Sequence, residues 1–380
     1  MEELNVLVVG SLHHNTLGVV RSLGEAGVQG ANLQILLVTL RHEEHNLISS
    51  SKYVDTKYVF FVNDYDEIVP WLQNHYDGQC KVVICCSDGG AEAVISRAKE
   101  LQGKYKTPNT IIPIEILSQK SQQGRIAKAC GLNVPDSIDY QVNRILEWND
   151  FPCIIKPYRS ATGAGKDDVR IFATKDAMVH SLHTLGSDII QIQQYIDKEM
   201  EYQLIGCSFD EGKTIIIPGF TKMIRQPKNT NTGYLMYSPI NELDFDRDAV
   251  EMFIREIGYS GLFSVEFIRG KDGKDYFLEI NMRNDGNAYC VKSAGVNLPY
   301  LWAFYQTYGK IPDIPLSFSE SIYFIPDFND LKVAFKQVGL IKWVKQFKKA
   351  QSHSIYNKQD MKPFRYEFWR QVKRVLKIRK

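Results

Sequence analysis

Cysteine is scarce in this sequence and forms no recognisable motif. The 380 residues contain 7 cysteines, none of them in a CxxC pair of the kind that holds zinc or exchanges disulfides. Most lie within apolar runs such as VVICC and FPCII, where small buried hydrophobic side chains are expected. The pattern excludes a disulfide framework and favours a reducing cytoplasm as the compartment.

Long apolar runs and nucleotide-binding fingerprints are missing as well. No run of about 18 apolar residues exists, so we expect no membrane-spanning helix. The start, MEELNVLVVG, is acidic and leads directly into a strand, unlike a signal peptide. GxGxxG is absent, which argues against a nicotinamide-dependent oxidoreductase. What remains is a globular chain, 44% apolar and 24% charged, long enough for two or three domains.

The first third alternates between strand and helix patterns. Strands are predicted at 5–10, 33–40, 58–62, 81–86 and 110–114, with helices between them. This order predicts an α/β domain with a parallel sheet covered by helices.

Two loops of this region follow strands and open helices, where open α/β sheets bind ligands. They are GSLHHNTLG (10–18) and SDGGAE (87–92). His13 and His14 are substrate-binding candidates, and the alternative is that they are ordinary polar loop residues.

The pattern changes from Ile116 onward. A helix is predicted over 118–131, and it carries Lys120. Strands in hairpins follow at 151–172, 189–196, 201–209 and 213–224, and a helix near 246–257. Long consecutive strands indicate a largely antiparallel sheet.

A hairpin then places two glutamates on one face. SVEFIRGKDGKDYFLEIN reads as two strands joined at Asp272-Gly273, a dipeptide that favours a two-residue type I′ turn. That turn sets Lys271 opposite Lys274 and Glu266 opposite Glu279. Period-two alternation puts Phe277, Glu279, Asn281 and Arg283 on one face, and Leu278, Ile280 and Met282 on the other.

Facing carboxylates repel each other, so a stable protein needs a compensating cation there. Glu266 and Glu279, with the amide oxygen of Asn281, suit Mg²⁺, which keeps waters and takes further ligands from phosphates. Zinc is disfavoured, because no His or Cys is adjacent. The alternative is that the two glutamates are exposed and unrelated.

A glycine-containing loop could cradle the phosphates that such a metal holds. RSATGAGKDD (159–168) offers backbone amides that can approach an anion closely, although it fails the P-loop pattern. Lys156 ends the strand before this loop, where a lysine is seldom buried without a partner.

These residues, in this order, resemble the ATP-grasp superfamily over roughly 116–299, and in particular its carbamoyl-phosphate-synthase-like and D-aspartate-ligase-like carboxylate–amine ligases. The resemblance implies that Lys120 and Lys156 contact the nucleotide, that the Gly-rich loop covers its phosphates, that the hinge strand contacts adenine and that Glu201 in KEMEYQL binds ribose. The loop and hinge positions are Ser160, Thr162, Gly163, Gly165, Gln193, Gln194, Tyr195 and Ile196.

The same resemblance assigns the metal and catalytic roles. Glu266, Glu279 and Asn281 match the family's metal ligands, and Arg283 matches an arginine that steadies the transferring phosphoryl group together with Lys156. Gln194 stands where many members carry an acidic residue, and the loop has fewer glycines than many. The implied cofactors are ATP and Mg²⁺, with Mn²⁺ as an alternative metal.

The implied reaction is an ADP-forming ligation. ATP converts a carboxylate into an acyl phosphate, and an amine then displaces the phosphate; amino-acid, peptide or cell-envelope precursor metabolism would be typical. Within TKMIRQPKNTNTGY (221–234), Lys222 and Arg225 are candidates for a substrate carboxylate, the alternative being a plain strand and surface loop. A non-catalytic or regulatory ATP-binding module is the second hypothesis for the whole chain. Both substrates would be small molecules, and a homo-oligomer is allowed.

The end of the chain is strongly basic. Residues 341–380 contain 13 Lys and Arg against Asp360 and Glu367, a net charge of +11, which leaves −9 for the other 340 residues because the whole chain carries +2. We expect this uneven charge distribution to reflect the partners that the tail binds.

Two segments of the tail, 340–349 and 364–380, show helical apolar spacing flanked by cations. One hypothesis is that they bind an anionic membrane, holding the enzyme on the inner face near a lipid-linked acceptor. The other is that their apolar stripes pack on the protein body. Nucleic acid is not expected, since no binding module is recognisable. The stripes are Leu340, Trp343, Val344 and Phe347, and Phe364, Phe368, Val372 and Leu376.

Three regions are therefore predicted: an N-terminal α/β domain over 1–115, an α+β ATP-grasp domain over 116–310 and a basic helical extension over 311–380. The ATP-grasp part would have two lobes with antiparallel sheets, about 116–195 and 196–310.

Overall fold

The computed structural model of the chain describes residues 3–142, 144, 146–157, 170–182, 188–226 and 232–376, apart from the side chains of Lys332 and Val375. Its N-terminal part is a five-stranded parallel sheet in the order β3-β2-β1-β4-β5. The strands are β1 Val6–Gly10, β2 Leu33–Val38, β3 Val59–Val62, β4 Lys81–Cys85 and β5 Tyr105–Lys106.

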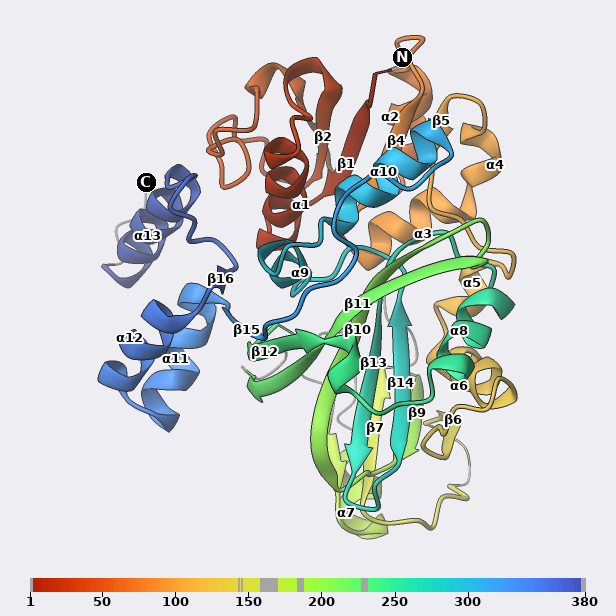
Figure 1. Cartoon of the computed structure of the whole chain (residues 1–380). Helices are drawn as coiled ribbons and strands as arrows, with labels where there is room; N and C mark the ends of the chain where they lie inside the picture. The colour runs from red at the N-terminus through yellow and green to blue at the C-terminus, as the bar shows by residue number, and fades with distance from the viewer. Residues whose placement is uncertain are drawn as a thin grey trace.

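Helices cover both faces of this sheet (Figure 1). Strands β1 and β4 are buried along their whole length, which is why they read as continuous apolar runs. The helices are α1 His14–Glu25, α2 Ile68–Asn74, α3 Asp88–Ser96 and α4 Ala98–Leu101.

The strand predicted at 110–114 is wrong. Asn109 forms an isolated bridge with Ser260, and the N–H of Ile111 donates to the carbonyl of Ile257. The segment thus pairs with the chain that leaves a later helix, and Pro113 then leads into α5, Ile114–Leu117. The fifth strand of the sheet lies earlier, at Tyr105.

Two antiparallel arrangements follow. The smaller is a four-stranded sheet in the order β6-β9-β7-β8, and the larger is a seven-stranded sheet in the order β14-β13-β10-β11-β12-β15-β16. The smaller sheet and its helix are β6 Ser137–Gln141, β7 Cys153–Pro157, β8 Arg170–Phe172, α7 Lys175–Leu182 and β9 Ile189–Gln194.

The large sheet begins with the long strands β10 Lys198–Phe209 and β11 Thr214–Arg225, and β12 Tyr234–Pro239 follows. The hairpin of β13 Gly261–Gly270 and β14 Asp275–Asn281 completes one edge. Around the sheet lie α6 Lys120–Ala129, α8 Arg247–Glu256, α9 Tyr289–Ser293 and α10 Leu298–Tyr308.

The hydrophobic cores cross the boundary drawn near residue 115. One cluster joins Val83 and Leu101 to Phe263 and Phe277, and a second joins Val8 and Leu17 to residues of β10 and α10. A third cluster belongs to the small sheet alone. The N-terminal sheet and the large sheet therefore share their interior, which fixes the loops of the former beside the latter.

The C-terminal region contributes strands that the sequence did not predict. β15 Ile322–Ile325 pairs with β12, and β16 Ser352–His353 pairs with β15 in parallel, so the large sheet continues past residue 310. The predicted tail helices are present as α12 Leu340–Lys349 and α13 Lys362–Val375, and α11 Asp327–Gln337 precedes them. Residues 377–380 of the second predicted helix lie outside the described residues.

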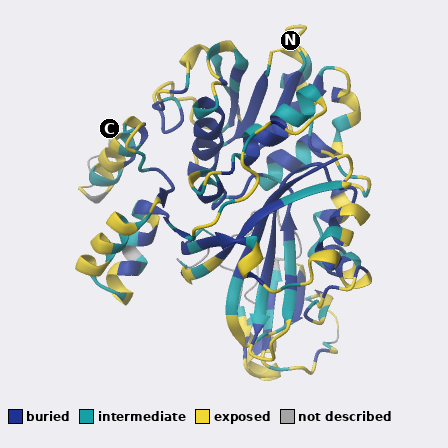
Figure 2. Cartoon of the chain, in the orientation of Figure 1, coloured by how far each residue is buried: buried dark blue, intermediate teal, exposed yellow. Residues whose placement is uncertain are grey.

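These last helices lie at one side of the molecule, away from the N-terminal sheet's strands (Figure 1), with much of their outer surface exposed (Figure 2). No helix among the described residues is both long and apolar enough to span a bilayer.

Candidate active site

The β13–β14 hairpin pairs Glu266 with Glu279, as predicted, but by a different route. The turn is not a two-residue turn: the N–H of Gly270 donates to the carbonyl of Lys274, so the predicted facing of Lys271 and Lys274 is wrong. Arg269 consequently pairs with Asp275, one step out of the predicted register.

A β-bulge at Leu278 restores the register. Phe267 pairs with Phe277, whereas the next residue back, Glu266, pairs with Glu279, which leaves Leu278 as the extra residue. The bulge also turns Phe277 to the other face, where it joins Ile280 and Met282 in the core. The predicted grouping of Phe277 with Glu279 is therefore wrong.

The carboxylate of Glu266 is held by amide groups. The Nε2 atom of Gln203 donates to its Oε1 atom at 3.1 Å, and the Nδ2 atom of Asn281 donates to the same oxygen at 3.0 Å. Burial, reinforced by the neighbouring negative charge of Glu279, raises the pKa of Glu266 to about 8. Three side chains from three adjacent strands thus meet at one buried point.

Glu279 has a cationic partner instead. The Nζ atom of Lys120 lies 2.8 Å from its Oε2 atom. Burial would raise the pKa of Glu279, but the charge and hydrogen bond of Lys120 outweigh it, so the pKa is lowered. The facing acids therefore sit in opposite electrostatic environments.

Gln123 explains how Lys120 reaches this position. Its amide accepts from the N–H of Ile280 at 2.9 Å and donates to the carbonyls of Leu117 at 2.6 Å and Ile280 at 3.2 Å. These bonds lock the start of α6 against β14, one residue from Glu279. Lys120 is the first residue of that helix.

Lys156 projects from β7 of the small sheet. Its Nζ atom donates to Oε1 of Gln193 on the neighbouring β9 at 2.6 Å. Burial, together with the charge of Lys120, lowers the pKa of Lys156 to about 8, while Glu279 and Glu266 act in the opposite direction. The two predicted lysines are thus close enough to influence each other, as one phosphate-binding site requires.

The hinge and ribose positions lie at the junction of the two sheets. The N–H of Gln194 donates to Asp136 at 2.8 Å and that of Tyr195 to Pro152 at 3.3 Å, so these backbone donors already have partners. Ile196 and Glu201 follow, and Glu201 pairs with Lys198 at 2.7 Å.

The predicted phosphate-loop residues Ser160, Thr162, Gly163 and Gly165 lie outside the described residues. Their assignment stays a prediction.

Arg283 is gripped by two carboxylates from different parts of the fold. Its Nε atom donates to Asp88, at the start of α3, and its Nη1 atom donates to Asp285, both at 2.9 Å. Burial opposes the charge of Arg283, but the two acids outweigh it and raise its pKa. The SDGGAE loop is thereby connected directly to the hairpin's end.

The turn that follows β14 contacts residues of the other predicted ligand-binding loops. Asn15 donates to the carbonyl of Asn284 at 2.7 Å, and a Cβ placed on Gly286 would lie 3.5 Å from Nε2 of His14 and 2.6 Å from Oγ1 of Thr232. Segment 10–18, Asp88 of segment 87–92 and Thr232 of the predicted acceptor segment thus converge on residues 283–287.

His13 and His14 differ in exposure. His13 is exposed and caps α1 by accepting from the N–H of Asn15, whereas His14 is buried, which lowers its pKa well below the usual value. Their rings lie 3.8 Å apart.

The two substrate candidates on β11, Lys222 and Arg225, lie in different environments. Arg225 is buried, and its guanidinium binds Asp330 of α11 in two hydrogen bonds at 2.8 and 2.6 Å. The structure therefore gives Arg225 a connecting role and contradicts its assignment to a substrate carboxylate. Lys222 is exposed on the same strand.

Sequence reasoning missed the amides that hold the acids. Gln203 bridges Glu266 and Asn287, whose Nδ2 atom donates to its Oε1 atom at 2.8 Å. A signal existed, because Gln203 lies two residues after Glu201 and shares its face of β10. Gln123 carried no comparable signal, since its partner Ile280 lies 157 residues away in the sequence.

The donor set fits Mg²⁺. Two carboxylates and an amide, all able to offer oxygen ligands, lie together: Glu266 and Asn281 are buried, and Glu279 is partly buried. No grouping of three or more His, Cys, Asp or Glu suited to a metal occurs in the described part of the chain. Glu266, Glu279 and Asn281 would hold the ion, and the remaining positions would be open to phosphate oxygens.

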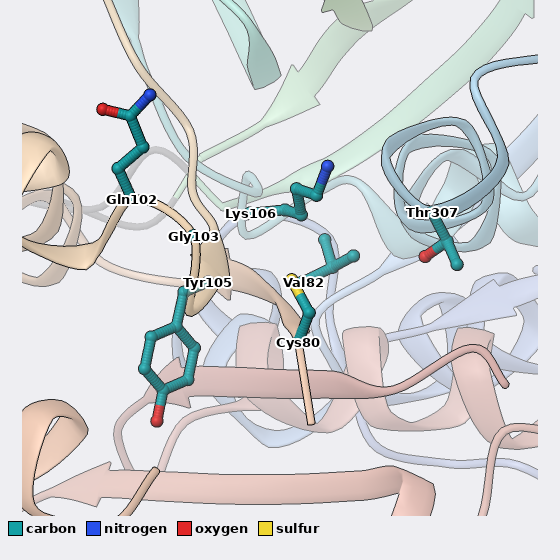
Figure 3. A pocket seen from close by; sticks show the side chains of 7 residues that line it. All are labelled: Cys80, Val82, Gln102, Gly103, Tyr105, Lys106 and Thr307. Carbon is teal, nitrogen blue, oxygen red and sulfur yellow. The ribbon is translucent and has the colours of Figure 1, made fainter. Parts of the chain in front are cut away.

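A cavity lies away from the hairpin. Its volume is about 530 Å³, and Lys106 is the only charged side chain among its lining residues (Figure 3). None of the predicted site residues lines it. We therefore place the chemistry at the hairpin. The lining residues are Cys80, Val82, Gln102, Gly103, Tyr105, Lys106 and Thr307.

Solved structures with the same architecture are ATP-grasp ligases, and the predicted ATP-grasp fold is confirmed. The L-amino acid ligase of Bacillus licheniformis matches with a TM-score of 0.60 and 15% identity, covering 80% of this chain and 74% of that one. N5-carboxyaminoimidazole synthetase of Staphylococcus aureus, solved with ADP, matches with a TM-score of 0.65 and 13% identity, covering 85% and 82%.

A third match is shared by structure and sequence. The biotin carboxylase domain of Hydrogenobacter thermophilus 2-oxoglutarate carboxylase, in complex with MgADP, ADP and bicarbonate, has a TM-score of 0.63 and 17% identity, covering 83% of this chain and 73% of that one. The small subunit of that enzyme is 22% identical over 298 residues, which is 70% of this chain; the match spans only 58% of the subunit's length. No protein-family model matches the sequence.

Proposed function

We propose that this protein is an Mg²⁺-dependent, ADP-forming ligase that activates a small carboxylate as an acyl phosphate and joins it to an amine. The observation that carries the proposal is the pairing of the buried Glu266 with the partly buried Glu279, flanked by Asn281 and Lys120. The ATP-grasp fold and its relatives, which include ligases solved with ADP, support it.

The chemistry follows from the charges at this point. A carboxylate oxygen of the substrate attacks the γ-phosphorus of ATP, the bond to the β-phosphate oxygen breaks, and ADP leaves. The amine then attacks the acyl carbon, the phosphate leaves with the electron pair of the C–O bond, and one proton of the amine passes to the phosphate or to water. The metal would neutralise negative charge on the transferring group.

The chain's own cations have separate tasks in this scheme. Lys156 is partly buried and its pKa is lowered, so an arriving phosphate would stabilise its charged form. Lys120 holds Glu279 in place, and Arg283 is fixed at the edge nearest the N-terminal sheet. Preorganised charges of this kind stabilise a transition state without rearrangement.

The acceptor would bind where segment 10–18, Asp88 and Thr232 converge on residues 283–287. His13, His14, Thr232 and Lys222 are the candidates there or close by in the chain, and Arg225 is withdrawn because Asp330 occupies it. In finer detail, we propose that the acceptor belongs to amino-acid, peptide or cell-envelope precursor metabolism. Its amine would be carried either by a free small molecule or by a lipid-linked one.

The proposal is tested with a matrix of candidate acids and amines. We expect ADP formation that requires one acid and one amine together, and a condensed product by mass spectrometry. Formation of AMP and pyrophosphate would contradict it. ATP binding with no turnover for any pair, tested against amino acids, peptides and bicarbonate, would favour the regulatory alternative.

A further inference from the structure

The C-terminal helices present a surface that combines exposed apolar side chains with lysines. Ile341 is 77% exposed, Phe335 64% and Leu340 51%. They lie where α11 ends and α12 begins, two helices that pack against each other. We call this surface the basic face: Phe335, Leu340, Ile341 and Val344 with Lys336, Lys342, Lys345 and Lys348, all of them exposed.

Every acidic side chain of this region points inward. Between residue 327 and the end of the chain the sequence has four acids, Asp327, Asp330, Asp360 and Glu367, and each is at most 4% exposed. Their charges are used internally, so the solvent-facing charge of the described part of this region is positive only. This makes the surface more basic than its composition alone implies.

The partners of these acids are all within the protein. Asp327 accepts from Ser354 at 3.0 Å, and Asp330 accepts from Arg225 and from Trp343 at 3.0 Å. Asp360 accepts from the buried Arg21 of α1 at 3.0 Å.

Glu367 accepts from Arg370 at 2.7 Å within α13. Three of the four acids thus attach the helices to the sheet and to the N-terminal part, and the region is a fixed part of the molecule.

The two predicted apolar stripes divide between packing and exposure. Trp343 and Phe347 turn inward, the ring of Phe347 lying 4.5 Å from that of His353 and 6.5 Å from that of Phe364. The rest of the α12 stripe stays outside. Internal packing thus accounts for only half of each stripe, and something else must account for exposed Ile341 and Leu340.

We propose that the basic face binds the surface of an anionic lipid membrane. Exposed aliphatic side chains would enter the headgroup boundary while the surrounding lysines contact anionic headgroups. A nucleic acid would use the lysines but gain nothing from Ile341 and Leu340. A second copy of the chain would bring like charges together. The inference does not depend on the proposed ligase activity.

The experiment is flotation of the full-length chain with vesicles of phosphatidylcholine, alone or mixed with phosphatidylglycerol. We expect binding to the mixed vesicles only, weakened by high salt. The charge variant Lys342→Gln/Lys345→Gln/Lys348→Gln should lose at least ~100-fold in affinity for the mixed vesicles. The apolar variant Leu340→Ser/Ile341→Ser should also lose binding, and at low salt as well.

Matched controls carry the same changes on other exposed residues. Leu40 is 84% exposed in the N-terminal part, and Lys57, Lys99 and Lys106 are exposed there too. Leu40→Ser and Lys57→Gln/Lys99→Gln/Lys106→Gln should bind vesicles as the wild type does. Because every changed side chain is on the surface, all variants should keep the wild-type melting temperature.

Three results would overturn the proposal. One is failure of the wild type to bind anionic vesicles, and another is equal binding by the wild type and the basic-face variants. The third is a dimer in sedimentation velocity that dissociates in the apolar variant while vesicle binding is absent, which would assign the face to a second copy.

Discussion

Single residues of the candidate site hold one another in place through a chain of hydrogen bonds. Gln203 joins Glu266 to Asn287, and Asp285 joins Ser264 to Arg283. Buried polar networks with every member bonded restrict the positions of their groups. A site built this way presents its carboxylates at fixed positions to an incoming metal and nucleotide.

The residue with the sharpest predicted effect is Glu279. We expect Glu279→Gln to lower acid- and amine-dependent ADP formation at least ~100-fold, because removing a charge that acts on the transition state costs about 3 kcal/mol. It should also weaken Mg²⁺ binding, so that a higher Mg²⁺ concentration is needed for half-maximal activity, measured by titrating the metal at saturating ATP. Glu251→Gln, on the surface of α8, should change neither; full activity of Glu279→Gln would remove the pair from the mechanism.

Arg283 requires a gentler substitution. Arg283→Ala would leave the carboxylate of Asp285, 3% exposed, without its cation, and so would mix stability with catalysis. Arg283→Lys keeps a charge there but cannot bind both acids in the same geometry. Reduced turnover with a near-wild-type melting temperature is the expected outcome for that variant.

The sequence predicted the acids but not the residues that position them. Glu266, Glu279 and Asn281 lie within one hairpin, so local spacing and one turn signal were enough to group them. Gln123 and Asp88 meet their partners only after distant elements pack, and no local pattern encodes that meeting. Arg225 was misassigned for the same reason, since its partner Asp330 lies 105 residues away.

Among the structural elements, the β13–β14 hairpin shows how a register can be predicted correctly through two compensating errors. The turn contains one residue more than Asp272-Gly273 suggests, and the bulge at Leu278 adds one on the opposite strand. Bulges depend on packing against neighbouring strands and helices, which a single-strand pattern does not contain. The parallel sheet was easier, because its buried strands read as uninterrupted apolar runs.

The buried ion pair between β11 and α11 permits a stability prediction. Asp330→Ala should lower the free energy of unfolding by about 3–5 kcal/mol, because Arg225 would remain buried without a counter-charge. Urea unfolding measures the change. Removing an acid from the exposed Arg247–Glu251 pair should cost less than about 1 kcal/mol. Equal effects at both sites would contradict the structure.

At the scale of the whole molecule, the C-terminal region is part of the body as well as a basic surface. β16 extends the large sheet, and Asp360 compensates the buried charge of Arg21. The helices 340–349 and 364–380 were predicted from periodicity, but the strand between them was not, because two residues give no recognisable pattern.

Two truncations separate these roles. A chain ending at residue 339 loses β16 and Asp360, so we expect a much lower melting temperature and poor recovery of folded protein. A chain ending at residue 361 keeps both and should be considerably more stable. Thermal unfolding of the two chains gives the comparison, and equal stability would argue against a stabilising role of β16 and Asp360.

The central claim is that ATP activates a carboxylate as an acyl phosphate at the Glu266–Glu279 pair, and isotope transfer tests it most directly. Once the matrix has identified the acid, it is supplied with oxygen-18 in its carboxylate. The account predicts that released phosphate carries one oxygen-18 atom, because the carboxylate oxygen that attacks ATP leaves with the phosphate. Unlabelled phosphate during product formation would contradict it.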